Sequence, residues 1–153
     1  MTRHMVLALC ISASVAAPAF AETANHKTAA HVFLVKMGKG DFTGLDRIYG
    51  PAFVVHSAGK KFTLEEDNES GKALRAAAPD VKVSVERMTG EAELVAVHWR
   101  ATGTNTVASA GMPGNGKAFD VEGMTFFRFD QGRIVEEWSV TDWMTLMKQL
   151  GGS

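Results

Sequence analysis

The chain has 153 residues, with 16 Lys and Arg against 17 Asp and Glu, and 46% of its residues are hydrophobic. This length fits one domain behind a short leader. The charges form no block of either sign, which argues against a nucleic-acid partner and against binding to an acidic membrane surface. The single cysteine, Cys10, lies near the start. The remainder of the chain therefore has no internal disulfide and no thiol nucleophile.

Residues 1–21 have the pattern of a cleaved signal peptide. Arg3 precedes an apolar run over 5–16, and Ala19-Phe20-Ala21 supplies the small-x-small motif of a cleavage site. The run is shorter than the roughly 20 residues of a membrane-spanning helix. We therefore expect cleavage after Ala21, a mature domain over 22–153, a periplasmic or secreted location and no membrane anchor after cleavage. The alternative is an N-terminal anchor that stays attached.

The first half of the mature chain has helical spacing of its apolar residues. Asp41 is a candidate N-cap, Thr63 and Glu66 have the spacing of a capping box, and Pro79 follows the last helical segment. The predicted elements are helices over 24–37, 41–49 and 63–78, with a short strand over 52–56.

After Pro79 the apolar residues recur with period two, which is typical of strands. Val95, Val97, Trp99 and Ala101 share one face of a long strand. The predicted order is a strand from 81, a turn at 89–91, a strand over 95–101, a loop over 103–117, strands over 119–129 and 133–141, and a helix over 143–150. Helices followed by a meander indicate an α+β fold with the helices on one face of the sheet.

Alternation along the last strand suggests a chemical site. One face carries Ile134, Glu136, Trp138, Val140 and Asp142, and the other carries Val135, Glu137, Ser139 and Thr141. The first set is the more apolar, so we predict that it faces inward. Asp142 and Glu136 would then lie at an apolar wall, where desolvation raises the pKa of a carboxyl toward that of a general acid or base. The alternative is that Asp142 only caps the last helix.

Other chemistries have little support in the sequence. Residues 111–117 match the spacing of a phosphate-binding loop up to Lys117, but Ala118 stands where a hydroxyl should hold magnesium, and a strand follows rather than a helix. His26 and His31 are five residues apart, which is not a ligand spacing on one helical face. The Gly-x-Ser-x-Gly motif of serine hydrolases is absent from the sequence.

The segments 111–117, 122–138 and 149–151, together with Asp142, resemble the SnoaL-like polyketide cyclase family, a branch of the nuclear transport factor two-like superfamily. The resemblance extends from about residue 30 to residue 151. It implies a cone-shaped, strongly curved antiparallel β-sheet with N-terminal helices packed on its concave face. It also implies an apolar pocket, a homodimer or higher homo-oligomer, and neither cofactor nor metal.

The resemblance also implies roles for single residues. An aspartate near the end of the last strand is the acid/base of the characterised cyclases, which close a ring by an intramolecular aldol reaction, and Asp142 stands at that place. His56 lies near a position that is often His, and it would share the proton transfer. The alternative for His56 is a structural role. Trp99, Phe126, Trp138 and Glu136 are the candidate ligand-binding residues, with ordinary core packing as the alternative for the aromatic ones.

Two positions depart from the family pattern, so the resemblance does not imply an identical active site or an identical substrate. His98 stands where Arg is common, and Asn105 stands where the family usually has His. His98 and Arg100 are expected on the exposed or subunit-contact side of the sheet, opposite Trp99.

The sequence thus predicts an exported protein with an apolar small-molecule pocket and cofactor-independent acid/base catalysis on a carbonyl compound, as an aldol-type cyclase, isomerase or lyase. The alternative is a non-catalytic periplasmic ligand-binding or oligomerisation module, because this fold also serves such functions. A third hypothesis is the addition of water to an epoxide in the same pocket.

Overall fold

The computed structural model describes residues 18–151, so residues 1–17 of the predicted signal peptide lie outside the described part. The helical elements are α1 (Pro18–His31), the π-helix η1 (Val32–Met37), the 3-10 helix η2 (Leu45–Arg47), α2 (Leu64–Ala77) and α3 (Trp143–Gln149). The strands are β1 (Tyr49–Ser57), β2 (Lys60–Phe62), β3 (Lys82–Glu91), β4 (Leu94–Asn105), β5 (Ala108–Ser109), β6 (Met112–Pro113), β7 (Lys117–Asp130) and β8 (Arg133–Thr141).

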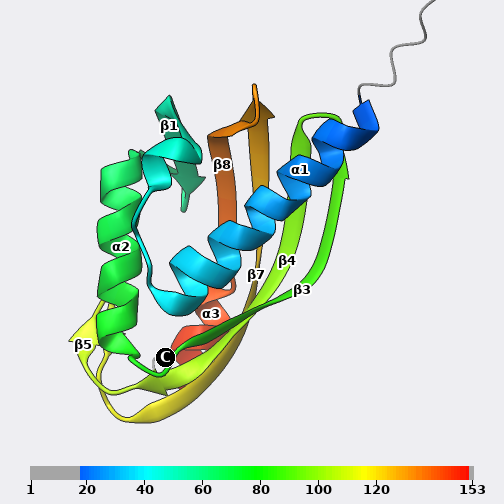
Figure 1. Cartoon of the computed structure of the whole chain (residues 1–153). Helices are drawn as coiled ribbons and strands as arrows, with labels where there is room; N and C mark the ends of the chain where they lie inside the picture. Colours follow the sequence, from blue (N-terminus) through cyan, green and yellow to red (C-terminus); the bar gives the residue numbers. More distant parts are fainter. Residues whose placement is uncertain (1–17, 152–153) are drawn as a thin grey trace, which may run out of the picture.

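Six strands form one curved, open sheet in the order β2-β1-β8-β7-β4-β3, and β5 pairs with β6 in a small hairpin (Figure 1). The predicted α+β class is confirmed. The sheet is mixed rather than wholly antiparallel, because β1 runs parallel to β8. The two strands are distant in sequence, because α2 and the strands β2 to β7 lie between them, so no hairpin imposes the antiparallel direction.

The helices α1 and η1 cross one face of the sheet, which we call the inner face (Figure 1). Strands β4 and β7 alternate strictly, with Val95, Val97 and Phe127 buried on the inner face. These residues pack against Val32 and Phe33 in one core cluster. A second cluster fills the other end of the molecule, where Ala77, Val81, Ala101, Phe119, Val121, Leu146 and Leu150 meet.

Helix α2 is fixed at both of its ends. Thr63 and Glu66 form the predicted capping box, in which Thr63 N–H donates to Glu66 Oε2 at 2.7 Å and Glu66 N–H donates to Thr63 Oγ1 at 3.3 Å. Near its other end, Arg75 donates to the carbonyl oxygens of Met37 and Gly38 at 3.0 and 2.6 Å. These carbonyls belong to the end of the helix that begins with α1, so Arg75 satisfies groups that a helix terminus leaves without partners.

Three predicted segments differ from the structure. The helix expected over 41–49 is reduced to η2, because Asp41 accepts hydrogen bonds from Thr43 and holds a turn instead. The turn expected at 89–91 belongs to β3, which pairs with β4 as far as Glu91. The expected loop over 103–117 contains the end of β4 and the β5–β6 hairpin.

An irregularity in β8 changes which residues of that strand face inward. Ile134 pairs with Phe129, but the next pair is Glu136 with Arg128, so Val135 is an extra residue in the strand. Such a bulge reverses the inward and outward phase beyond it. Ile134 is buried, whereas Glu136 and Trp138 point to the outer face, which is the face opposite α1. The predicted inward face of β8 is therefore wrong beyond Ile134.

Candidate functional site

A cavity of about 390 Å³ lies between the inner face of the sheet and the helices η1 and α2. Such a volume lies within the usual range for small-molecule sites. The lining is mostly apolar and aromatic, with a few polar groups: Val32, Phe33, Lys36, Met37, Tyr49, Val55, Ser57, Ala58, Phe62, Asp67, Ser70, Trp99, Thr125, Phe127, Glu137, Ser139 and Trp143.

Three charged residues from three different elements meet at this inner cavity. Lys36 of η1 forms an ion pair with Asp67 of α2, and Lys36 is only 3% exposed. Glu137 of β8 points inward because of the bulge at Val135. Burial raises the pKa of Glu137 to about 8; the charge of Asp67 adds to this effect and that of Lys36 opposes it. At neutral pH the cavity therefore holds an ion pair and a protonated carboxyl.

The π-helical geometry of η1 is part of this arrangement. A π-turn is rare, and it occurs most often as a short segment at functional sites. Here it contains Phe33 and Lys36, which both line the cavity. Because Lys36 is held by Asp67 at its tip and Arg75 holds the end of the helix, the segment is tied to α2 at two places.

Tyr49, the one tyrosine of the chain, also lines the cavity. Lys36 Nζ lies 5.0 Å from the centre of its ring, and Phe53 packs edge-on against the ring at 4.4 Å between centroids. Burial raises the pKa of Tyr49 well above its ordinary value, and the charges of Glu137 and Asp67 raise it further. The hydroxyl therefore keeps its proton at neutral pH.

The opposite wall is built around Trp99, which the sequence placed correctly on the inner face of β4. Its indole N–H donates to Thr125 Oγ1 at 3.1 Å, and that hydroxyl lies 3.1 Å from Ser139 Oγ. Gly123 is paired with Trp99 in the sheet, and a Cβ atom at position 123 would lie 2.1 Å from the indole ring. The ring thus lies directly over a glycine, which leaves room for it.

The structure brings His56, Glu136 and Trp138 together, but on the outer face. His56 Nε2 lies 2.8 Å from Glu136 Oε1, and its ring stacks on that of Trp138 with 5.2 Å between centroids. Arg128 donates to Glu136 Oε2 at 2.8 and 3.0 Å. These hydrogen bonds, that of Arg128 first and that of His56 second, lower the pKa of Glu136. Glu136 is thus a fixed carboxylate, the opposite of the predicted desolvated acid.

An open groove of about 720 Å³ lies on the same outer face. Phe126 and Trp138 line it, and they are neighbours in the sheet. Four of the six predicted site residues, His56, Phe126, Glu136 and Trp138, therefore lie on the face opposite the inner cavity, and of the six only Trp99 lines that cavity. The bulge at Val135 explains the difference for Glu136 and Trp138, since the prediction assumed an unbroken alternation along β8.

Asp142 is the N-cap of α3, as the structural alternative anticipated. Its carboxylate accepts a hydrogen bond from Thr145 N–H at 2.9 Å, and this bond lowers the pKa of Asp142. The side chain is exposed and borders the outer groove rather than the inner cavity. The prediction that Asp142 lies at an inner apolar wall with a raised pKa is therefore wrong, while its predicted capping role is confirmed.

The two residues that depart from the family pattern, Asn105 and His98, both form polar contacts within the fold. Asn105 is fully buried; its amide donates to the carbonyl oxygens of Ala77 and Val107 and its carbonyl accepts from Gly114 N–H. It fixes the loop beyond β4. His98 lies on the outer face, where Nε2 is 3.0 Å from Glu122 Oε2.

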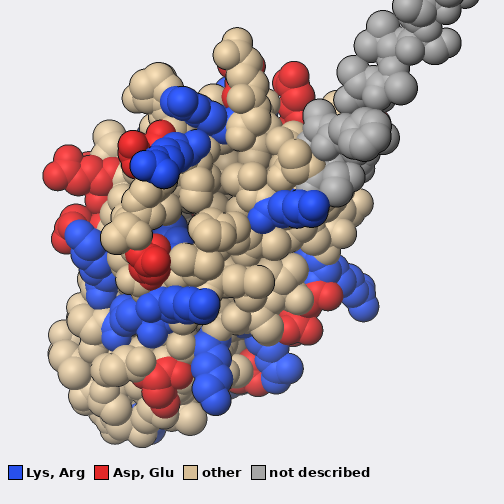
Figure 2. Space-filling view, viewed as in Figure 1, with Lys and Arg blue, Asp and Glu red and all other residues tan. Residues whose placement is uncertain are grey.

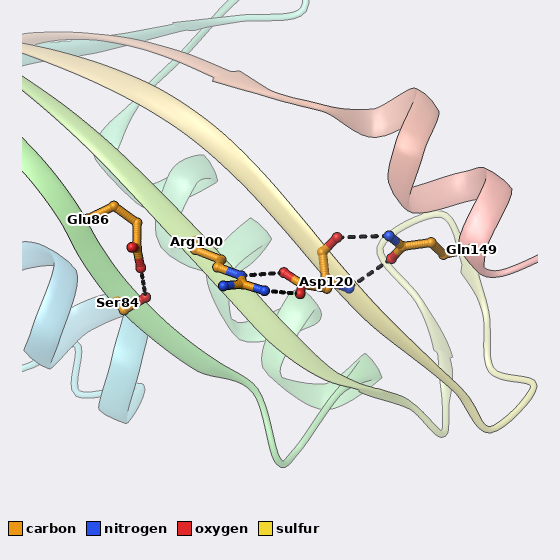
Figure 3. Close-up of polar contacts among 5 residues, drawn as sticks. All are labelled: Ser84, Glu86, Arg100, Asp120 and Gln149. Atoms are coloured by element: carbon orange, nitrogen blue, oxygen red, sulfur yellow. Dashed lines mark hydrogen bonds and ion pairs between the residues drawn. The ribbon is translucent and has the colours of Figure 1, made fainter.

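Arg100 lies in a row of polar contacts across the outer face (Figure 3). It forms a bidentate ion pair with Asp120, and the side-chain amide of Gln149 bonds both backbone groups of Asp120, at 2.7 and 2.9 Å. The predicted exposed side for His98 and Arg100 is confirmed by their outward direction.

The surface seen in Figure 2 carries acidic and basic side chains interspersed, without a broad area of one sign. Among residues 18–151, no group of three or more His, Cys, Asp or Glu side chains is placed to hold a metal ion. Within the same residues, no helix has both the length and the apolar character needed to cross a membrane.

Sequence reasoning missed Lys36, Asp67, Glu137 and Tyr49 as site residues. A signal for Lys36 was present, since it is the one charged residue in the apolar run 32–37. Glu137 carried no such signal, because its inward direction depends on the backbone bulge. Asp67 stands among other acidic residues of α2 that are solvent-exposed, and the sequence alone does not distinguish it from them.

Comparisons with known proteins agree with this architecture. The family model of the SnoaL-like polyketide cyclases matches residues 28–150 of this chain. AclR of Streptomyces galilaeus, a proposed hydroxylase, superposes with a TM-score of 0.76 at 20% identity, covering 85% of this chain and 97% of AclR. IdmH of Streptomyces antibioticus, a proposed polyketide cyclase, superposes with a TM-score of 0.72 at 26% identity, covering 83% and 98%.

A proposed SnoaL-like polyketide cyclase from Jannaschia sp. CCS1 gives a TM-score of 0.76 at 24% identity, covering 86% of this chain and 94% of that protein. Among curated proteins, none matches the chain significantly. These neighbours share the nuclear transport factor two-like fold, with its curved sheet and helices on one side.

Proposed function

Because the chain belongs to the SnoaL-like polyketide cyclase family, we propose that it binds a small carbonyl compound in the inner cavity and catalyses proton transfer there without a cofactor. The observation that carries this proposal is that two carboxyl groups line the same cavity, that of Asp67 from α2 in an ion pair with Lys36 and that of Glu137 from β8. Burial raises the pKa of Glu137 to about 8, so this carboxyl keeps its proton at neutral pH. In enzymes, two carboxyl groups in such different environments commonly serve as the base and the acid.

The proposed reaction begins with a ketone or ester whose carbonyl oxygen faces Glu137. Asp67 accepts a proton from the carbon next to the carbonyl, while Glu137 donates its proton to the carbonyl oxygen, and an enol forms. In the ring closure, the enol carbon attacks a second carbonyl of the same molecule, the oxygen of that carbonyl takes the proton from Asp67, and the enol oxygen returns its proton to Glu137 as the first carbonyl re-forms. In the isomerisation, Asp67 instead returns its proton to another carbon of the enol, and the enol oxygen returns its proton to Glu137. Lys36 keeps the charge of Asp67 balanced, and the apolar walls exclude water.

The test measures proton transfer directly, without a known substrate. We expect the wild-type protein to accelerate exchange of the α-protons of 2-tetralone with deuterated solvent at pH 7, followed by proton NMR. Glu137→Gln should reduce the protein-dependent rate by about 100-fold or more, in line with the usual contribution of a general acid. Glu65→Gln, an exposed change on α2, serves as the matched control.

The rival assignment, implied by the family resemblance, gives the acid/base role to Asp142 with His56. It has its own support in the structure, because Asp142, Phe126 and Trp138 border one groove. Asp142→Asn in the same assay separates the two sites. Loss of exchange in Asp142→Asn but not in Glu137→Gln would overturn the inner-cavity proposal. No exchange in the wild-type protein, together with saturable ligand binding, would favour the non-catalytic binding module.

We also propose that the protein is exported and that two copies associate. Export is supported by the small-x-small motif at 19–21 and the apolar run before it. Periplasmic protein should begin at Glu22, which intact-mass measurement would reveal; an unprocessed chain would contradict this. Association is supported by apolar side chains on the outer face, where Met124 is 57% and Val140 70% exposed.

A further inference from the structure

Two hydroxyl groups at the inner cavity, those of Thr125 and Ser139, have no part in the proposed proton transfer. Both residues line the cavity, and they lie opposite each other on the paired strands β7 and β8. The indole N–H of Trp99 donates to Thr125 Oγ1 at 3.1 Å, and Thr125 Oγ1 lies 3.1 Å from Ser139 Oγ. The three side chains thus form a chain of hydrogen bonds that starts at the indole, a group that can only donate.

Burial determines the direction of this chain of hydrogen bonds. Thr125 is 1% exposed, and among the described residues its hydroxyl has hydrogen-bond contacts with Trp99 and Ser139 alone. If Ser139 donated to Thr125, the proton of the Thr125 hydroxyl would be buried without an acceptor, which is unfavourable. Thr125 therefore donates to Ser139, and the hydroxyl proton of Ser139 stays available. Ser139 is only partly buried, so a ligand in the cavity can reach it.

Ser139 lies two residues beyond Glu137 on β8, and both side chains point to the inner face. The pairing with β7 is regular here, since Glu137 lies opposite Phe127 and Ser139 lies opposite Thr125. Two residues of a strand span about 7 Å. Because burial keeps the Glu137 carboxyl protonated at neutral pH, it is a hydrogen-bond donor, as is the Ser139 hydroxyl. One wall of the cavity therefore offers two donors at the spacing of one strand repeat.

We propose that Ser139 is a further substrate-binding residue: its hydroxyl donates to a second carbonyl oxygen of a ligand whose first carbonyl oxygen is bound by Glu137. This inference rests on the proposed function, and it selects ring closure of a dicarbonyl compound over isomerisation. The hydrogen bond from Ser139 stabilises the charge that develops on the attacked carbonyl until Asp67 protonates that oxygen, and Ser139 keeps its own proton. Thr125 and Trp99 are positioning residues, because they direct the Ser139 hydroxyl toward the ligand.

Three ligands of matched shape test the proposal. 1,3-Diacetylbenzene has two ketone oxygens, 3-isopropenylacetophenone replaces one of them with a CH₂ group, and 1,3-diisopropenylbenzene replaces both. The diketone cannot close a ring by an intramolecular aldol reaction, so its binding is measured without turnover. The measurement is titration calorimetry at pH 7 with the wild-type protein and Ser139→Ala. Ser57→Ala is the matched control, because Ser57 pairs with Ser139 and lines the same cavity but lies outside the chain of hydrogen bonds.

We expect the wild-type protein to bind the diketone about tenfold more tightly than the monoketone, which is the usual size of one buried hydrogen bond. Ser139→Ala should lose about tenfold for the diketone and stay within about twofold for the monoketone, which keeps its bond to Glu137. Ser57→Ala should retain the wild-type preference. Circular dichroism and melting curves establish that the variants are folded, and a general structural defect would lower both affinities together.

Two substitutions of different chemistry test the positioning role of Thr125. Thr125→Val removes the hydroxyl that directs Ser139, so the preference for the diketone over the monoketone should fall severalfold. Thr125→Ser keeps a hydroxyl at this place and should retain the preference. A merely structural role of Thr125 would change the affinities for both ligands equally.

Several outcomes would overturn the inference: equal affinity of the wild-type protein for diketone and monoketone, an unchanged preference in Ser139→Ala, loss of the preference in Ser57→Ala alone, or binding of none of the three ligands. The exchange assay with 2-tetralone, a monoketone, separates this inference from the proposed function, and Ser139→Ala should retain that exchange. Glu137-dependent exchange without a Ser139-dependent preference would leave the proposed function standing and remove the second contact. The reverse result would uphold the two-donor site and remove the proposed catalysis.

Discussion

At the scale of single residues, the protonation of Glu137 determines the chemistry of the inner cavity. Its ordinary pKa is 4.5, and in the folded protein burial raises it to about 8. Between pH 4.5 and about pH 8, the folded protein therefore holds this proton more tightly than the unfolded chain does. By linkage, the free energy of unfolding must fall as the pH rises through that interval, and it must level off above the folded-state pKa.

We predict that Glu137→Gln removes this dependence, because the amide keeps the size of the side chain but does not ionise. The measurement is urea unfolding at intervals from pH 5 to pH 9. The wild-type free energy of unfolding should decline toward pH 8, and the variant should gain relative to it as the pH rises. Parallel curves for the two proteins would show that the Glu137 carboxyl is not held protonated by the fold.

Gly123 provides a second test at residue scale. A methyl group at this position would overlap the Trp99 ring, so Gly123→Ala should destabilise the fold by about 1–3 kcal/mol, the usual cost of overpacking. Trp99→Phe shortens the ring that causes the overlap. In a double-mutant cycle followed by thermal unfolding, the double variant should be more stable than the sum of the two single changes implies. Simple additivity would mean that the two side chains do not meet.

At the scale of elements, β4 and β8 show what periodicity can and cannot predict. The inward residues of β4 follow from alternation alone, and Trp99 is placed correctly because the segment around it pairs regularly with β7. Alternation along β8 fails at Val135, where the backbone inserts one residue and the next side chains exchange faces. Neither glycine nor proline marks this bulge, so the sequence gives no sign of it.

The same limit explains how much of the site was predictable. The class of fold, the capping box at Thr63 and the capping role of Asp142 depend on local chemistry, and all three were predicted. The cluster of Lys36, Asp67 and Glu137 joins a π-helix, an α-helix and a strand that are distant in sequence. Its assembly depends on tertiary packing and on the bulge, and a single sequence read alone does not reveal either of them.

The attachment of helix α3 to strand β7 can be tested by one substitution. β8 pairs with β7 only as far as Gly123, so the backbone of Asp120 has no strand partner on that side, and Gln149 bonds both of its groups instead (Figure 3). Gln149→Ala should cost about 1 kcal/mol. It should also speed amide hydrogen exchange in α3, while Lys148→Ala, an exposed neighbour, should not. Unchanged exchange in Gln149→Ala would mean that packing of Leu146 and Leu150 alone holds the helix.

At the scale of the whole molecule, the two faces of the sheet differ in what covers them. Helices cover the inner face, whereas the outer face of the described chain carries an outer patch of Met124, Phe126, Trp138 and Val140, all of them at least 36% exposed. Contiguous exposed apolar side chains of this kind usually mark an interaction site.

The charges beside the outer patch favour a second copy of the chain as its partner. Several of these charged side chains are paired within the chain: Glu136 with both Arg128 and His56, His98 with Glu122, and Arg100 with Asp120. Such a face presents no excess of one sign that would repel an identical face. A two-fold contact between copies would therefore cover the patch while these pairs remain compensated.

We predict that the mature wild-type protein has about twice the mass of one chain in size-exclusion chromatography with light scattering at micromolar concentration. Val140→Glu and Met124→Glu should shift it to the mass of one chain while the circular dichroism stays unchanged, because each places an uncompensated charge in the contact. Leu34→Glu, which changes an equally exposed apolar side chain on η1, should leave the dimer intact. A monomeric wild-type protein would show that this contact does not form. A dimer that Leu34→Glu dissociates and Val140→Glu does not would place the contact elsewhere. The inner cavity lies on the other side of the sheet, so both outer-face variants should keep the Glu137-dependent proton exchange.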